Sequence, residues 1–189
     1  MKTHAPRLSS IAVSAAILLG AVSSYAQGTG IGLKGDYYSN TTLAGAVAAT
    51  RTDTSVNFEW STNKPIAALP SADKFSVRWT GKVEAPVAGE YTFLTRSDDG
   101  VRLWINGKLL VNNWNDHSPR WDQSVPVTLP AGKVDLQLEY YENQGSATIQ
   151  LYWRYPGQAE QIIPTARLYP ETIALQPAPP NTGRTWVSD

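Results

Sequence analysis

The stretch YTFLTRSDDGVRLWINGKLLV, residues 91–111, contains the signals that decide the fold class. Apolar and polar residues alternate from Tyr91 to Thr95 and again from Val101 to Ile105, as they do in half-buried strands. Asn106-Gly107 then supplies the dipeptide that favours a tight hairpin turn before residues 108–111. The stretch therefore predicts three short antiparallel strands.

The same alternation recurs on both sides of this stretch. It runs through residues 75–79 before it, and through residues 134–141 and 147–153 after it. We find no sustained helical spacing of apolar residues, and parallel strands would need crossover helices. The sequence therefore predicts an all-β antiparallel sandwich or barrel. Trp79, Trp104 and Trp153 fall in the strand patterns, so we expect them to belong to the scaffold.

The composition excludes several classes of protein. The chain has 189 residues, 16 basic and 16 acidic side chains and no cysteine. This length can bury a core without disulfides, and the charge balance offers no basic surface for nucleic acid. Seven Trp and nine Tyr against three Phe indicate aromatic residues that can stack on ligands or sit at interfaces.

The N-terminus has the pattern of a secretory signal peptide. Basic residues precede an apolar run at 11–19, and small residues end at Ala26. The run is too short to span a membrane, so we expect a secreted, periplasmic or cell-surface protein. Removal of residues 1–26 leaves a folded domain at 27–170 with a slight negative charge. The Pro-rich residues 171–189 resemble a linker, and the chain is interpreted as a fragment attached to an adjacent domain.

Asp98 and Asp99 form the sharpest candidate site, because they adjoin at the junction of two predicted strands. Both carboxylates can reach one cation only if the backbone between them turns. The loop 142–146 joins two later strands and could add oxygen ligands to the same ion, which suits calcium. The alternative is an ordinary turn with both carboxylates solvated.

A second candidate lies in the polar loop that follows the hairpin. Trp114 could stack on a sugar face while Asn113, Asp116 and His117 bond its hydroxyls. The alternative is a loop fixed by its own side chains, with Trp114 packed into the sandwich. His117 is the one histidine beyond the signal peptide, which excludes a zinc site built of several histidines.

The sequence gives little support for an enzyme. The sequence has no Gly-x-Ser-x-Gly motif for a nucleophilic serine. A carboxylate pair for glycoside hydrolysis could come from Glu139, Glu142, Asp98 or Asp99, but short alternating strands indicate no deep cleft. We therefore expect a binding module and no catalytic residue.

An ordered series of motifs resembles the protective-antigen fourteen-kilodalton domain, a jelly-roll-like β-sandwich found in bacterial toxins, glycosidases and fungal flocculin-type adhesins. The resemblance covers about residues 31–169. Its main motifs are SDDGVRLWING at 97–107, LPAG at 129–132, EYYEN at 139–143 and LYW at 151–153.

In the adhesin branch, paired aspartates joined by a cis peptide hold calcium together with a later asparagine, and the calcium binds sugar hydroxyls. The resemblance assigns these roles to Asp98, Asp99 and Asn143, with Glu142 as an alternative oxygen donor and Gln144 in the sugar-contacting loop. It implies a calcium-dependent carbohydrate-binding module whose partner is a glycan or polysaccharide. The alternative is a structural or protein-interaction spacer beside a catalytic or adhesive domain. The disulfides of the fungal members are missing here.

Overall fold

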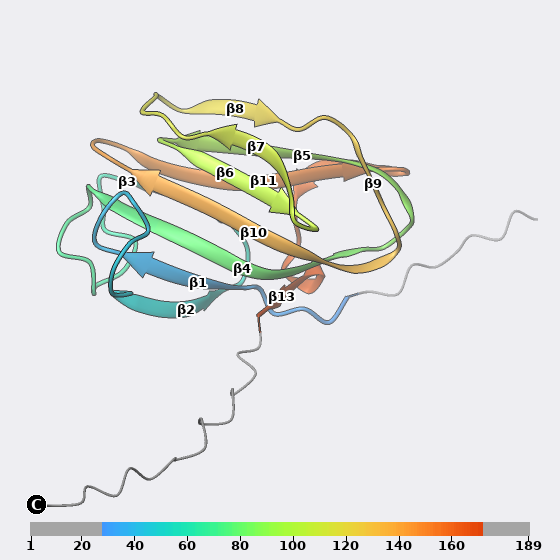
Figure 1. Ribbon diagram of the computed structural model, residues 1–189, viewed down its shortest axis with the longest axis horizontal. Coiled ribbons are helices and arrows are strands. Elements are labelled where there is room, and N and C mark those ends of the chain that lie inside the picture. The colour runs from blue at the N-terminus through green and yellow to red at the C-terminus, as the bar shows by residue number, and fades with distance from the viewer. Residues whose placement is uncertain (1–27, 172–189) are drawn as a thin grey trace, which may run out of the picture.

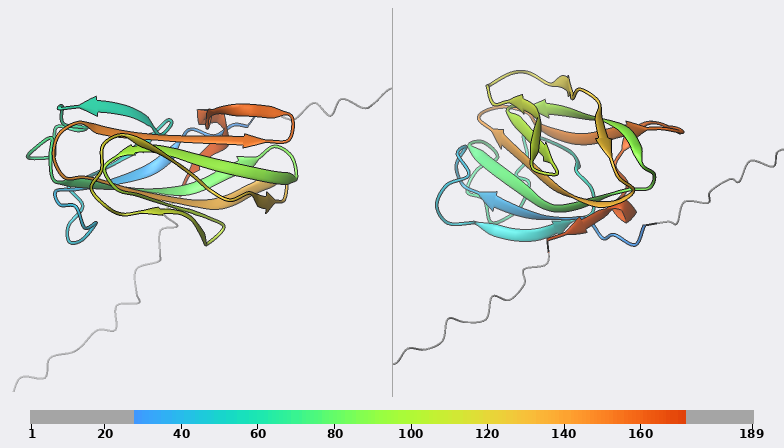
Figure 2. Two further views of the ribbon diagram at one scale, coloured as in Figure 1. Left: turned by 90° about the horizontal axis from the view of Figure 1, so that it is seen from above. Right: turned by 45° about the vertical axis from the view of Figure 1, so that its right-hand side comes forward.

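The computed structural model describes residues 28–171 as two antiparallel β-sheets packed face to face (Figures 1 and 2). The predicted signal peptide and residues 172–189 of the predicted tail lie outside this range. The predicted all-β sandwich is confirmed. Within the described range, no helix is long and apolar enough to cross a membrane.

The larger sheet has the strand order β2-β1-β4-β10-β6-β7, with β13 beside β4. Its strands are β1 (Leu33–Tyr38), β2 (Ala49–Asp53), β4 (Phe75–Ala85), β6 (Val101–Ile105), β7 (Lys108–Asn113), β10 (Gly132–Glu142) and β13 (Leu168–Pro170). The smaller sheet has the order β12-β11-β5-β8, with β3 beside β11 and β9 beside β5. Its strands are β3 (Asn57–Ser61), β5 (Gly89–Asp98), β8 (Arg120–Gln123), β9 (Val127–Leu129), β11 (Ala147–Tyr155) and β12 (Gln158–Ile162). A short 3₁₀ turn, η1 (Thr165–Arg167), precedes β13.

The core lies between the sheets, where every second residue of the long strands points inward. Val77 and Trp79 of β4 face inward beside Leu138 and Tyr140 of β10, and all four side chains are fully buried. The smaller sheet contributes similar alternating residues, and Trp153 is its largest buried side chain. Each apolar side chain buried in this way contributes about 1.5–3 kcal/mol to folding.

The strands expected from the alternation are present, and the expected hairpin closes where predicted. Asn106 and Gly107 have φ angles of 50° and 74°, the left-handed values that a type I′ turn needs. β6 and β7 pair on either side of this turn. The alternation therefore predicted the positions of these strands correctly, although β4 and β5 are longer than the patterns indicated.

Trp104 departs from its predicted role in the scaffold. It lies on β6 opposite Gln137 of β10, on the face of the larger sheet that points away from the core. Its side chain is half-buried, whereas Val101, Leu103 and Ile105 of the same strand are completely buried. The prediction was wrong for Trp104. Successive residues of a strand point to opposite faces of the sheet, and Trp104 lies between two inward-facing residues, so it points outward.

A buried carboxylate ties the first strands to the core. Asp53 accepts hydrogen bonds from the Tyr37 hydroxyl at 2.7 Å and from the Trp79 indole Nε1 at 2.7 Å, and it pairs with Arg51. This network joins β1, β2 and β4. Burial and the adjacent Asp53 charge raise the pKa of Tyr37, so the phenol stays a proton donor.

Candidate functional site

Both sheets contribute to the candidate site at one end of the sandwich. β5 of the smaller sheet ends at Asp98, and β6 of the larger sheet begins at Val101. β10 of the larger sheet ends at Glu142, which pairs with Phe75 of β4. The peptide bond between Asp98 and Asp99 is cis.

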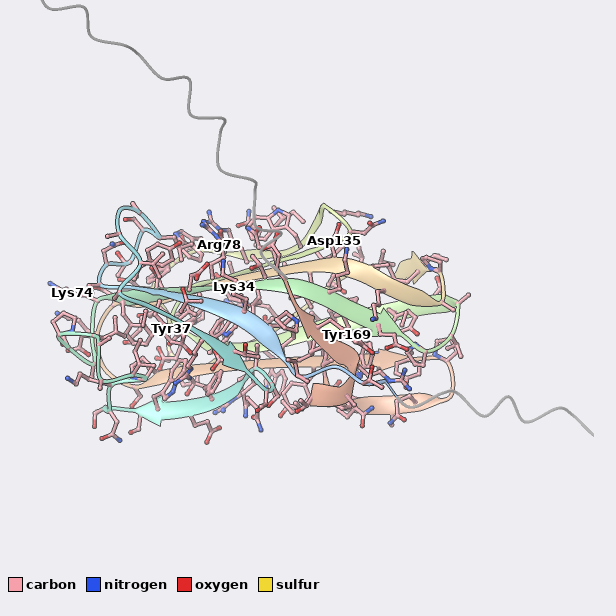
Figure 3. All side chains as sticks on the ribbon, turned by 90° about the horizontal axis from the view of Figure 1, so that it is seen from below. Lys34, Tyr37, Lys74, Arg78, Asp135 and Tyr169 are labelled. Atoms are coloured by element: carbon pink, nitrogen blue, oxygen red, sulfur yellow. The ribbon has the colours of Figure 1, made fainter. Side chains whose placement is uncertain are left out.

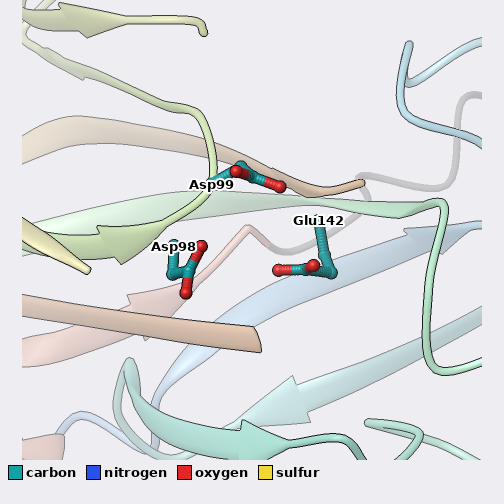
Figure 4. A group of neighbouring side chains, drawn as sticks. All are labelled: Asp98, Asp99 and Glu142. Carbon is teal, nitrogen blue, oxygen red and sulfur yellow. The ribbon is translucent and has the colours of Figure 1, made fainter. Parts of the chain in front are cut away.

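Three carboxylates gather at this end of the sandwich. One oxygen from each of Asp98, Asp99 and Glu142 lies within 4.8 Å of the others (Figure 4). The exposed fractions of the three residues are 8%, 5% and 0%. The two aspartates are therefore not the solvated pair of an ordinary turn, which was the alternative left open by the sequence.

The electrostatics of the cluster favour a cation. Burial and the charge of Asp99 raise the pKa of Glu142 to about 8. Burial and Asp99 also raise the pKa of Asp98. Among the described residues, Glu142 Oε1 is buried without a hydrogen-bond partner. Calcium takes six to eight oxygen ligands, so the oxygen-only donor set and the unpartnered oxygen fit this ion.

Asp99 is held in place by the two loops that flank the cluster. Its Oδ1 accepts the backbone N–H of His117 at 2.8 Å, and its Oδ2 accepts the backbone N–H of Asn143 at 2.9 Å. Each oxygen keeps a second lone pair after one such bond. The side chain is therefore oriented by the backbone and can still coordinate a cation.

Two adjacent tyrosines of β10 support the cluster from opposite faces of their sheet. Tyr140 points inward, where its hydroxyl contacts both the Asp98 carbonyl and Glu142 Oε2. Tyr141 points outward over Gly100. A Cβ on Gly100 would lie 2.1 Å from the Tyr141 ring, so a glycine must follow the aspartate pair. The sequence motif contains both tyrosines, but nothing in their spacing indicated these roles.

The rim of the site is joined to Tyr141 by hydrogen bonds. Asp116 accepts from the Tyr141 hydroxyl at 2.7 Å through Oδ1 and from Asn143 Nδ2 at 2.8 Å through Oδ2. These two bonds lower the pKa of Asp116, which is exposed. Asn143 was expected to be a metal ligand. Its amide nitrogen donates to Asp116, and its role as a ligand stays a prediction. Glu142, the alternative donor, is the third member of the carboxylate cluster.

His117 and Asn113 form a second part of the rim. Asn113 Nδ2 lies 2.9 Å from His117 Nε2 and donates to Asp122 Oδ2 at 2.7 Å. His117 Nδ1 lies 3.0 Å from the Ser118 carbonyl. A neutral imidazole protonated at Nδ1 satisfies both contacts, with Nε2 as the acceptor.

Trp114 is neither packed in the core nor freely exposed. It is half-buried on the outer face of the larger sheet, where the Arg102 guanidinium lies 3.9 Å from its ring centroid. The Trp114 and Tyr141 rings form a T-shaped pair with their centroids 4.7 Å apart. Gln144 is exposed in the loop after Asn143. The structure therefore brings the rim residues of the two loops to the same end as the carboxylates.

The stability of the chelator-treated protein should fall as pH rises from about 5 to about 8. Glu142 loses its proton near its usual value of 4.5 in the unfolded chain and at about 8 in the folded one. The folded state therefore binds more protons across this window, and its free energy of unfolding decreases as pH rises through it. Urea unfolding at several pH values measures the trend.

Glu142→Gln is the matched variant for this prediction, because it keeps the side chain's shape and removes its titration. Its midpoint of urea unfolding should vary less with pH than that of the parent. An equal slope in both proteins would contradict the role given to Glu142.

Comparison with known proteins places this chain in a family. The model of the PA14 domain matches residues 31–166. The anti-sigma-I factor RsgI3 of Acetivibrio thermocellus is 41% identical over 144 residues, which are 76% of this chain and 22% of that protein. The chain therefore spans about a fifth of that relative's length.

Solved structures agree with this match. An anti-sigma factor domain-containing protein from Clostridium clariflavum superposes with a TM-score of 0.73 at 32% identity, covering 82% of this chain and 53% of that one. The PA14 sugar-binding domain from an RTX adhesin shares the fold with a TM-score of 0.64 at 19% identity, covering 77% of this chain and 99% of that one. The chain belongs to the PA14 domain family.

Proposed function

We propose that this domain binds carbohydrate through a calcium ion held by Asp98, Asp99 and Glu142. The observation that carries the proposal is the buried cluster of three carboxylates in which Glu142 Oε1 has no partner among the described residues. Buried charges of one sign are costly unless a counter-ion is bound. A cation with a strong preference for oxygen removes that cost.

We propose that the site is open to a sugar on one side. When bound, calcium would offer the coordination positions that the protein leaves free to the hydroxyls of a sugar. Asn143 remains a candidate ligand through Oδ1, because its Nδ2 donates to Asp116. Because the orientation of Asp99 is already fixed, its side chain loses little conformational entropy when a cation binds.

The rim supplies the groups that a sugar needs beyond the cation. Asp116 is an exposed acceptor whose orientation is fixed by Tyr141 and Asn143. Trp114, with one ring face covered by Arg102, offers apolar surface beside it. We propose that Asn113, His117 and Gln144 complete the contacts with the sugar.

We propose a binding module and not an enzyme. Glu139, one of the carboxylates considered for glycoside hydrolysis, is buried between Arg78 and Arg102, where each of its oxygens is held in an ion pair. The predicted signal peptide supports action outside the cytoplasm. The relative from A. thermocellus is much longer than this chain, which supports an adjacent domain.

A second candidate function is an interaction module of a larger regulatory protein. Its support is the 41% identity to an anti-sigma-I factor and the similarity to a second anti-sigma factor protein. The two functions are compatible if glycan binding is the input to regulation. A glycan-binding experiment distinguishes them: if the domain binds no glycan, only the interaction role remains.

A glycan array probed with calcium and then with a chelator tests the main proposal. We expect binding that the chelator removes and that Asp99→Asn reduces by at least about tenfold, which corresponds to about 1.4 kcal/mol. Asp36→Asn is the matched control, because Asp36 lies on β1 in a pair with Lys34 away from the cluster. Binding that survives the chelator, or no binding to any glycan, would contradict the proposal.

A further inference from the structure

A groove lies on the outer face of the larger sheet, away from the carboxylate cluster. Its volume is about 1010 Å³, and its floor is formed by β4, β10 and the end of β6. Gln137 of β10 lines it beside Trp104 and Thr80, its partners on the two neighbouring strands. Gln137 lies five residues before Glu142, so the groove and the cluster are about 17 Å apart along the strand.

The far wall of the groove is built from segments that come from the two ends of the domain. β13 pairs with β4 at Gly81, where a Cβ would lie 2.1 Å from the Tyr169 carbonyl oxygen. The segment before β1 runs beside it, with Gly32 N–H bonded to the Leu168 carbonyl at 3.0 Å. Ile31 in this segment is 60% exposed and faces the groove.

Tyr169 is fixed within this wall. Its hydroxyl accepts the Thr29 N–H at 3.0 Å and donates to Glu84, and Lys133 Nζ lies 3.5 Å from its ring centroid. Figure 3 shows Tyr169 on β13 and Asp135 on β10. A wall held by three contacts is already organised before a ligand arrives, which lowers the entropy cost of binding.

The lining combines aromatic surface with polar groups and carries no net charge. Trp104 and Tyr169 supply the aromatic surface, and the charged lining residues are two lysines and two acids. Gln137 Nε2 donates to Glu139 at 3.1 Å, which leaves its carbonyl oxygen as an acceptor. Thr80 Oγ1 is buried without a partner among the described residues.

This chemistry suits a neutral ligand with many hydroxyl groups. A polyanion or an acidic peptide would need an excess of basic groups, which two lysines and two acids do not provide. A sugar offers apolar ring faces to aromatic side chains and hydroxyls to amide, hydroxyl and charged groups. A volume at the upper end of the range for small-molecule sites, about 300–1,000 Å³, has room for several sugar units.

We infer that this groove is a second carbohydrate-binding site, which takes internal sugars of a neutral glycan chain without a cation. Trp104 provides the platform, and Gln137 provides hydrogen bonds. The site shares no residue with the carboxylate cluster, so the two can be inactivated separately.

Affinity electrophoresis with a chelator present tests this inference. The protein is run through gels that contain arabinoxylan, mixed-linkage β-glucan or galactomannan. We expect at least one polysaccharide to retard the parent and the Asp99→Asn variant equally. Trp104→Ala should weaken the retardation by about tenfold, the equivalent of about 1.4 kcal/mol, and Gln137→Ala should weaken it without loss of fold by circular dichroism.

Trp121→Ala is the matched control, because Trp121 is 48% exposed on β8 of the smaller sheet. It should leave the retardation unchanged. Absence of retardation by every polysaccharide, or an equal loss in Trp104→Ala and Trp121→Ala, would overturn the inference. Binding that needs calcium and disappears in Asp99→Asn would support the calcium site and overturn the groove. If Trp104→Ala changes only self-association, the groove is a protein contact and the inference fails.

Discussion

Calcium is expected to raise the melting temperature of the chelator-treated protein by about 3–10 °C near pH 8. Extracellular calcium sites have dissociation constants of about 10⁻⁴–10⁻³ M, so calcium at about 10 mM exceeds them by about 10–100-fold. This excess stabilises the folded state by about 1.4–2.7 kcal/mol. For a domain of this size, each kcal/mol moves the melting temperature by about 2–4 °C.

The shift should be largest at high pH, where Asp98, Asp99 and Glu142 are all charged. Below about pH 8 the cluster holds a proton, because burial and Asp99 raise the pKa of Glu142 to about 8. Cation binding must then displace that proton. Differential scanning calorimetry at two pH values measures the effect. Asp99→Asn should show little shift, and magnesium at the same concentration should give a smaller one. An equal shift in the parent and Asp99→Asn would contradict the site.

Glu139→Ala is expected to lower the free energy of unfolding by about 2–4 kcal/mol. Glu139 is buried on β10, where Oε1 pairs with Arg78 at 2.8 Å and Oε2 pairs with Arg102 at 2.6 Å. Removing one partner of a buried ion pair costs about 3–5 kcal/mol, because the other charge is left uncompensated. The two arginines are about one-third exposed, so water relieves part of this cost.

Urea unfolding compares this variant with Glu160→Ala. Glu160 pairs with Arg154 at 3.6 Å, and both side chains are about 40% exposed. Removing an exposed pair of this kind should change stability by less than about 1 kcal/mol. Similar losses of stability in the two variants would show that the Glu139 ion pairs with Arg78 and Arg102 stabilise the fold no more than an exposed ion pair does. Because Arg102 also covers Trp114, Glu139→Ala should alter the tryptophan fluorescence of the folded protein.

The fold class was predictable from periodicity because the sandwich has long strands with one buried face. Residues 75–79, 101–105 and 134–141 each alternate in the register that the structure shows. The edge strands β2, β3 and β8 were not assigned by the alternation. They are short and half-exposed, so few of their residues are constrained by burial. The resemblance to the family supplied the rest of the architecture.

The candidate site was predictable in part. Adjacent aspartates at a strand junction are visible in a sequence, and Glu142, which the sequence offered as an alternative donor, lies beside them in the structure. The position of the Asn143 side chain could not be predicted, because its partner Asp116 lies in a loop 27 residues earlier in the chain. The groove could not be predicted either, because its wall is built from residues 29–31 and β13, which meet only in the folded domain.

The most direct test of the proposed site is a calcium-binding isotherm measured by calorimetry on the chelator-treated protein. The proposal predicts one calcium ion per chain in the parent, proton release near neutral pH and no measurable binding in Asp99→Asn. Asp36→Asn should bind as the parent does. An isotherm without heat in the parent, or one that Asp99→Asn leaves unchanged, would contradict the assignment of calcium to Asp98, Asp99 and Glu142.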